Sequence, residues 1–126
     1  MDSSAFLNTA TSAREVRVVV QTEQPEVRTP IWIVTVGPDA FVRSYRAEHG
    51  RWYQNVHTSE AFPLELDGEL VSVRPDPVHD AHVLEEVSNA YLAKYEGEPE
   101  LDDMVSLPVV ATTLRLVPVG SWRHDG

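Results

Sequence analysis

The stretch IWIVTVGPDAFVRSYR, residues 31–46, decides the fold class of this chain. Residues 31–36 are apolar or β-branched throughout, which is typical of a strand that is buried on both sides or lines a barrel. Gly37-Pro38-Asp39 supplies turn chemistry, and AFVRSYR resumes the β pattern. The segment 31–46 therefore predicts a β-hairpin, in whose second arm alternate side chains point to opposite faces.

Three further segments carry β patterns. EVRVVVQ, residues 15–21, alternates β-branched residues and predicts a strand. AFPLELDGELVSVRP, residues 61–75, holds Asp67-Gly68 between two apolar-patterned arms, which predicts a second hairpin with a type I′ turn. VVATTLRLVPV, residues 109–119, predicts one long alternating strand. The last residues, SWRHDG, are expected to be loose.

One main helix is predicted between these segments. Asp76 is expected to cap its N-terminus, with Pro77 at the first helical position, and Gly97 is expected to end it. Apolar residues recur at i, i+3 and i+4 within it, which predicts a stripe that packs on the sheet. The stripe consists of Val83, Leu84, Val87, Ala90, Tyr91 and Tyr95.

The order strand, hairpin, hairpin, helix, strand predicts a mainly β (α+β) fold. We expect a small antiparallel β-barrel of about six strands with one main amphipathic helix, because one helix cannot cover both faces of an open sheet. A flat α+β sheet with one helical face is the alternative. Residues 1–126 are expected to form a single domain, with a core over about residues 15–118 and flexible ends.

Composition narrows the classes of function. The chain has no cysteine, which excludes thiolate catalysis and cysteine-ligated metal sites. The N-terminus lacks the features of a signal peptide, and no apolar run approaches the ~20 residues that span a bilayer. A net charge of −10 disfavours nucleic acid and anionic membranes as partners. We therefore expect a cytoplasmic protein with neither partner.

The charge is unevenly distributed. Between Arg28 and His57, four arginines face two acids, whereas residues 59–103 carry thirteen acids against Arg74 and Lys94. The basic segment can hold one or two phosphates, or it is simply the remainder of a mixed surface. His79 and His82 stand three residues apart, but no metal-binding motif accompanies them, so no metal is expected. The chain also lacks nucleophile-elbow, P-loop and GxGxxG motifs, so any catalysis is expected to use a borrowed cofactor.

Residues 28–56, RTPIWIVTVGPDAFVRSYRAEHGRWYQNV, resemble the split-barrel flavoproteins, the pyridoxamine-phosphate-oxidase-like group. They resemble more closely a bacterial family catalogued as domain of unknown function 2255, often classed with that group. AYLAKYEG and ATTLRLVP also look like that family, so the likeness covers about residues 15–118. The matching residues are Thr29-Pro30-Ile31-Trp32, Val42-Arg43-Ser44, Gly50-Arg51-Trp52-Tyr53 and Asn55.

The resemblance implies that the barrel is a split β-barrel. It also implies an oxidoreductase that binds FMN or a deazaflavin, acts on an unknown substrate and forms a homodimer. By position, Arg43 and Ser44 at a strand end and Arg51 at a helix start would grip the cofactor phosphate. Trp32 or Trp52 would stack on the flat ring. The residues thereby assigned to the cofactor are Pro30, Trp32, Arg43, Ser44, Arg51, Trp52 and Asn55.

A second hypothesis is a non-enzymatic barrel that binds a small ligand or a protein and holds no flavin. In either case strand alternation divides the basic segment between two faces, and Arg46 and His49 are expected on the solvent side.

Overall fold

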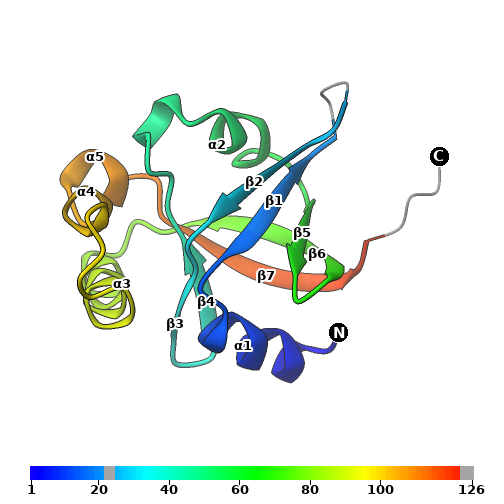
Figure 1. Ribbon diagram of the computed structural model, residues 1–126, viewed down its shortest axis with the longest axis horizontal. Helices are drawn as coiled ribbons and strands as arrows, with labels where there is room; N and C mark the ends of the chain where they lie inside the picture. The colour runs from blue at the N-terminus through cyan, green and yellow to red at the C-terminus, as the bar shows by residue number, and fades with distance from the viewer. Residues whose placement is uncertain (22–24, 123–126) are drawn as a thin grey trace.

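The computed structural model describes residues 1–21 and 25–122. Seven strands form one antiparallel sheet in the order β2-β1-β5-β6-β7-β4-β3, which curls into a half-barrel (Figure 1). This confirms the predicted fold class, with one strand more than expected. The strands are β1 Val16–Val20, β2 Val27–Ile31, β3 Val34–Val36, β4 Asp39–Val42, β5 Phe62–Leu66, β6 Glu69–Pro77 and β7 Leu114–Ser121.

The two edges of the sheet meet where β2 passes into β3. These strands lie at opposite edges, yet only Trp32 and Ile33 separate them in sequence. The sheet therefore has to curl until its edges come together at this point. The strand predicted over 31–36 is interrupted here, because the amide of Ile33 donates to the Tyr95 hydroxyl at 3.2 Å rather than to a neighbouring strand.

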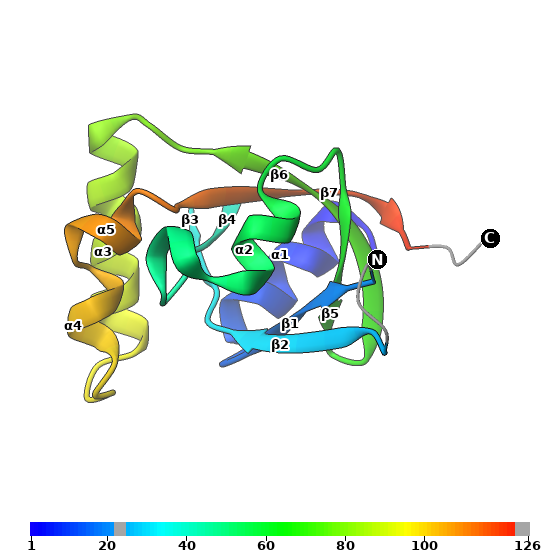
Figure 2. The ribbon, with the colours of Figure 1, turned by 90° about the horizontal axis from the view of Figure 1, so that it is seen from above.

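Helices close the half-barrel and build a layer beside it. The helices are α1 Ser3–Ser12, α2 Arg51–Val56, α3 Ala81–Lys94, α4 Leu101–Met104, α5 Leu107–Val110 and the 3₁₀ turn η1 Ala47–His49. Helices α3, α4 and α5 gather at one end of the sheet in both views (Figures 1 and 2). Helix α1 was not among the predicted elements, and the side chain of Asp2 caps it by accepting from the amide of Ala5.

Two apolar cores result from this arrangement. The larger one fills the curl of the sheet, and Phe6 of α1 and Trp52 of α2 pack into it. The smaller one lies between the outer side of the β3–β4 hairpin and the helical layer, and includes Phe41, Val87 and Tyr91. All of the predicted α3 stripe except Leu84 contributes to this second core. None of the helices in the described part of the chain is long and apolar enough to cross a membrane.

The Asp67-Gly68 hairpin is confirmed. Both residues have positive φ, 50° and 78°, as a type I′ turn requires. The predicted helix start at Asp76 is wrong, since β6 continues through Pro77 and Asp76 pairs with Arg115 of β7. The helix begins after Asp80, whose side chain accepts from the amide of Val83 at 3.0 Å.

The strand predicted over 109–119 is also only half right. Residues 107–110 form α5, which begins after Ser106 with Pro108 in its first turn, and β7 starts at Leu114. The hydroxyls of Thr112 and Thr113 donate to the carbonyls of Val109 and Val110, which ends the helix before the strand. Of the tail, β7 reaches Ser121, and residues 123–126 lie outside the described residues.

Candidate functional site

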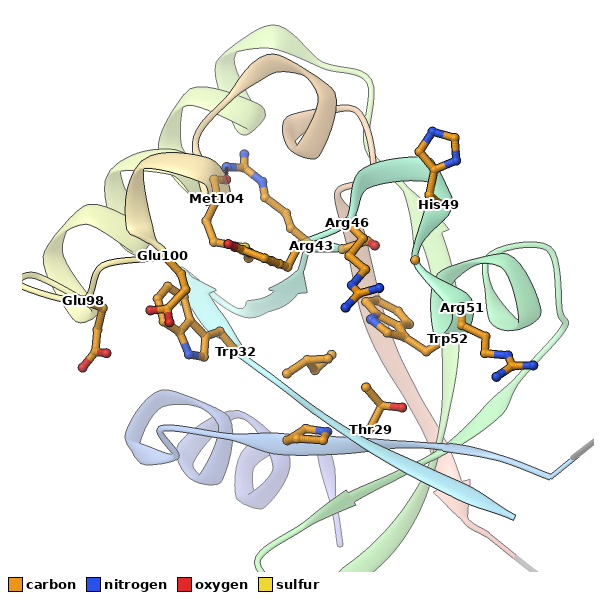
Figure 3. A pocket seen from close by; sticks show the side chains of 15 residues that line it. Thr29, Trp32, Arg43, Arg46, His49, Arg51, Trp52, Glu98, Glu100 and Met104 are labelled. Carbon is orange, nitrogen blue, oxygen red and sulfur yellow. Dashed lines mark hydrogen bonds between the residues drawn. The ribbon is translucent and has the colours of Figure 1, made fainter. Parts of the chain in front are cut away.

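A cavity of about 600 Å³ opens between β2, the segment 43–52 and the residues that lead into α4 (Figure 3). Six of the seven residues predicted to bind a cofactor line it, and Asn55 does not. The lining residues are Thr29, Pro30, Ile31, Trp32, Arg43, Ser44, Tyr45, Arg46, His49, Gly50, Arg51, Trp52, Glu98, Glu100 and Met104. The fold thus brings two separate sequence segments, 29–32 and 43–52, to one hollow.

The guanidinium of Arg43 binds the helical layer and does not point into the cavity. Its side chain is 1% exposed and runs away from the cavity toward Met104 (Figure 3). The guanidinium donates four hydrogen bonds, to the carbonyls of Leu84 and Met104 and to the hydroxyls of Ser88 and Thr113, at 2.8–3.0 Å. It also lies over the ring of Tyr91. Burial lowers the pKa of Arg43, and none of these partners is a carboxylate.

Ser44 is likewise committed to local structure. It is fully buried, and its hydroxyl donates to the carbonyl of Ala47 at 2.8 Å. A Cβ added at Gly50 would stand 2.1 Å from the Ser44 oxygen, so glycine is needed there for lack of space. Ala47 has φ of 56°, which costs an L-residue on the order of 1 kcal/mol. Close packing and local strain therefore shape the turn from Ser44 to Gly50.

Arg51 and Asn55 belong to α2, but they diverge. Arg51 stands at the rim and its side chain extends outward (Figure 3). The Asn55 amide donates to the carbonyl of Arg51 at 2.8 Å, so this side chain lies along its own helix. Because α2 has only six residues, we assign no anion site to its N-terminus.

Trp32, Trp52 and Pro30 supply the apolar wall. Trp32 is half-buried and stacks on Tyr95, with ring centroids 4.0 Å apart and planes 3° apart. Trp52 is 6% exposed and is part of the larger core. Pro30 is exposed on the edge strand β2. Trp32 and Pro30 are therefore more accessible from the cavity than Trp52, which is almost completely buried.

Arg46 is the cation that points into the cavity (Figure 3). The expectation that His49 and Arg46 are exposed is confirmed, although β4 ends at Val42 and the strand alternation does not extend to Arg46. Its side chain is exposed, and among the described residues its guanidinium has no hydrogen-bond or ion-pair partner. His49 also lines the cavity, but its ring points outward (Figure 3).

Acidic and aromatic residues line the opposite end. Glu98 and Glu100 lie there with Trp32, across the cavity from Arg51 (Figure 3). The Tyr45 hydroxyl donates to Asp103 of α4 at 3.1 Å, and this hydrogen bond is the main reason that the pKa of Tyr45 is raised. The two ends of the cavity therefore carry opposite charge.

The residues that sequence reasoning missed fall into two groups. Tyr45 and Arg46 lie inside the basic segment. The predicted strand ran through them, whereas β4 ends at Val42, and a strand predicted to end there would have indicated that both can face the cavity. Glu98, Glu100 and Met104 follow α3 in the chain, and no sequence signal predicts that they lie beside residue 30. No group of three or more metal-ligating side chains occurs within residues 1–21 and 25–122.

The comparisons with known proteins agree with the fold. The structure resembles the crystal structure of the conserved hypothetical protein Rv2991 from Mycobacterium tuberculosis, with a TM-score of 0.59 and 12% identity, covering 98% of this chain and 82% of that one. At that identity the likeness shows the fold alone. No curated protein matches the sequence. The model of a family described as uncharacterized proteins conserved in bacteria matches residues 7–116. The chain therefore belongs to this bacterial family, domain of unknown function 2255 (DUF2255).

Proposed function

We propose that this protein is a flavin- or deazaflavin-binding oxidoreductase of the split-barrel type. The observation that carries the proposal is the meeting of segments 29–32 and 43–52 around one cavity. Its volume of about 600 Å³ falls within the range of small-molecule and cofactor sites. Its lining combines an aromatic wall with arginines, which suits a flat ring that carries an anionic group.

The geometry redistributes the roles that the resemblance implies. Arg46, with Arg51 at the rim, is the natural ligand for a phosphate or another anionic side chain of the cofactor. Arg43 and Ser44 would not contact the cofactor with their polar atoms, because these already bond to protein groups. They would instead fix the turn that carries Arg46. Trp32 and Pro30 offer the face against which the ring would lie.

A flavin-class ring supplies hydride transfer when bound, and the side chains bind and orient it. Ile31 and Met104 are buried side chains of the lining, and with Trp32 they give the cavity apolar surface against which a ring could pack. The proposal includes a homodimer with the cofactor near the subunit interface, as the resemblance implies. Light scattering on the purified protein tests that part, and a mass of one chain would contradict it.

A non-enzymatic ligand-binding barrel is the second candidate. One observation favours it: the guanidinium of Arg43, expected at the phosphate, is committed to the helical layer. With one cation fewer, the cavity also suits a smaller or less charged ligand than FMN.

A titration separates the two candidates. Purified protein is examined for yellow colour and then titrated with FMN, riboflavin and a deazaflavin while ring and tryptophan fluorescence are followed. The proposal expects FMN or the deazaflavin to bind at tens of micromolar or below. It expects riboflavin, which lacks the phosphate, to bind about tenfold or more weakly, because hydrogen bonds to charged groups are worth about 1.5–3 kcal/mol. Absence of binding by both anionic cofactors would favour the second candidate.

A further inference from the structure

The end of the cavity beyond the proposed phosphate ligands has its own chemistry. Trp32, Tyr45, Glu98 and Glu100 line it. Figure 3 shows Glu98, Glu100 and Trp32 together on the side opposite Arg51. This end combines aromatic rings with carboxylates, whereas the other end carries arginines.

The two rings are held in place by contacts outside the cavity. Trp32 stacks on Tyr95 at 4.0 Å, so one face of its indole is fixed against the protein. Tyr45 is 49% exposed, yet its hydroxyl is held by Asp103 at 3.1 Å. Rings positioned in this way lose little conformational entropy when a ligand binds against them.

The carboxylates differ in how far they are neutralised. Glu98 pairs with Arg14 at 3.4 Å, and its amide donates to the carbonyl of Tyr95, which places it beside the Trp32 stack. Asp103 and, to a smaller extent, Glu100 raise the pKa of Tyr45, and the charge of Arg46 lowers it by less, so two carboxylates and one arginine act on this ring. Within the described part of the chain, Glu100 makes no ion pair. Negative charge therefore remains next to the two rings.

We propose that this end of the cavity binds a cationic group, an amine or a quaternary ammonium, carried by the substrate. A cation against the faces of Trp and Tyr gains from the ring quadrupole, and a nearby carboxylate adds direct attraction. The chain's net charge of −10 favours the approach of cations in general. Assigning the cation to the substrate rests on the proposed function, since it takes the cofactor's anion to lie at Arg46.

The proposed cation site is tested with choline and its neutral isostere 3,3-dimethylbutan-1-ol, because the two differ in charge and hardly in shape. Each is titrated into the full chain by calorimetry or ligand-observed NMR. Choline is expected to bind about fivefold or more tightly than the isostere. Glu100→Gln and Tyr45→Leu are expected to abolish that preference, whereas Glu85→Gln, on the exposed side of α3, preserves it.

Each outcome decides the matter. Equal binding of the two probes, no choline binding up to about 100 mM, or an unchanged preference in Glu100→Gln would overturn the proposal. FMN is titrated into the same samples. If FMN binds and choline is not preferred, the cation site fails and the proposed function stands. If choline is preferred and neither FMN nor a deazaflavin binds, the cation site stands and the proposed function fails.

Discussion

The indole of Trp32 lies flat on the ring of Tyr95, 4.0 Å away and within 3° of parallel. The same tyrosine accepts from the amide of Ile33 and donates to the carbonyl of Arg14 through its hydroxyl. Arg14 lies over the ring as well, at 4.6 Å. One side chain of α3's C-terminus therefore fixes the two-residue link between the edges of the sheet, and with it the aromatic wall of the cavity.

Tyr95→Phe should lower the free energy of unfolding by about 1–3 kcal/mol, because the buried amide of Ile33 loses its partner. Tyr45→Phe is the matched control, since it removes a hydroxyl with an exposed partner, Asp103, and should change stability by no more than about 0.5 kcal/mol. Urea denaturation of both variants measures the difference. Equal effects would mean that the Tyr95 hydroxyl does not hold the link.

Replacement by methionine should destabilise the protein at Arg43 and have almost no effect on stability at Arg46. Arg43→Met leaves the carbonyls of Leu84 and Met104 without their donor and should cost about 2–4 kcal/mol. Arg46→Met, at an exposed position, should stay within about 0.5 kcal/mol of the parent chain. Chemical denaturation checks both values. A stable Arg43→Met variant would refute the structural role of that arginine.

Gly50→Ala and Ser44→Ala should be strongly non-additive. An alanine Cβ at position 50 displaces the Ser44 hydroxyl from its bond to Ala47, for an expected cost of about 1–3 kcal/mol. Replacing Ser44 by alanine removes the obstructing oxygen, so the double variant should be more stable than the sum of the single effects predicts. A double-mutant cycle in urea measures the coupling. Additive effects would contradict the close approach.

The lowered pKa of Lys94 should make the free energy of unfolding depend on pH. Burial, and then the charge of Arg14, lower the pKa of its ammonium to about 8. Between about pH 8 and about pH 10 the unfolded chain binds more protons at Lys94 than the folded chain, so the free energy of unfolding should rise with pH. Lys94 is only half-buried, so solvent screening limits the gain to about 1 kcal/mol or less.

Urea midpoints at about pH 7.5 and about pH 9 measure this effect, because few tyrosines of the unfolded chain are ionised at about pH 9. Lys94→Met is the control, because it lacks the titrating group and should lose this rise with pH. Stability that falls across the window in the parent chain, or an identical rise in the variant, would contradict the assignment.

Cofactor affinity should distinguish Arg46 from Asn55. Arg46→Met should weaken FMN binding by about tenfold or more, since a charged hydrogen bond is worth about 1.5–3 kcal/mol. Asn55→Ala should leave it unchanged, because Asn55 does not line the cavity. Fluorescence titration gives both constants. A larger loss in Asn55→Ala than in Arg46→Met would place the ligand elsewhere.

The sequence correctly predicted those features that depend only on neighbouring residues. The turn at Asp67-Gly68 was predictable because Asp and Gly tolerate the positive φ angles that it requires. Asp76-Pro77 carried an equally good helix-start signal, but pairing with β7, almost forty residues later, kept it in the sheet. Strand or helix could not be decided there without knowing the tertiary partner.

The site shows the same limit. The basic, aromatic segment was recognised in sequence, and most of its assigned residues do line one cavity. Which arginine faces the cavity was not predictable, because Arg43 is drawn into the helical layer by Leu84, Ser88, Met104 and Thr113, 41 to 70 residues away. The acidic end was invisible in sequence for the same reason, since β2 and the residues before α4 meet only in the folded chain.

An NMR titration of ¹⁵N-labelled protein with FMN tests the central claim most directly, because the indole N–H groups of Trp32 and Trp52 report from the cavity itself. We predict saturable shifts at these indoles and at the amides of Thr29, Arg46 and Gly50, with Asn55 and the β5–β6 hairpin unaffected. Unchanged spectra with both FMN and a deazaflavin, or shifts confined to residues outside the cavity, would contradict the account.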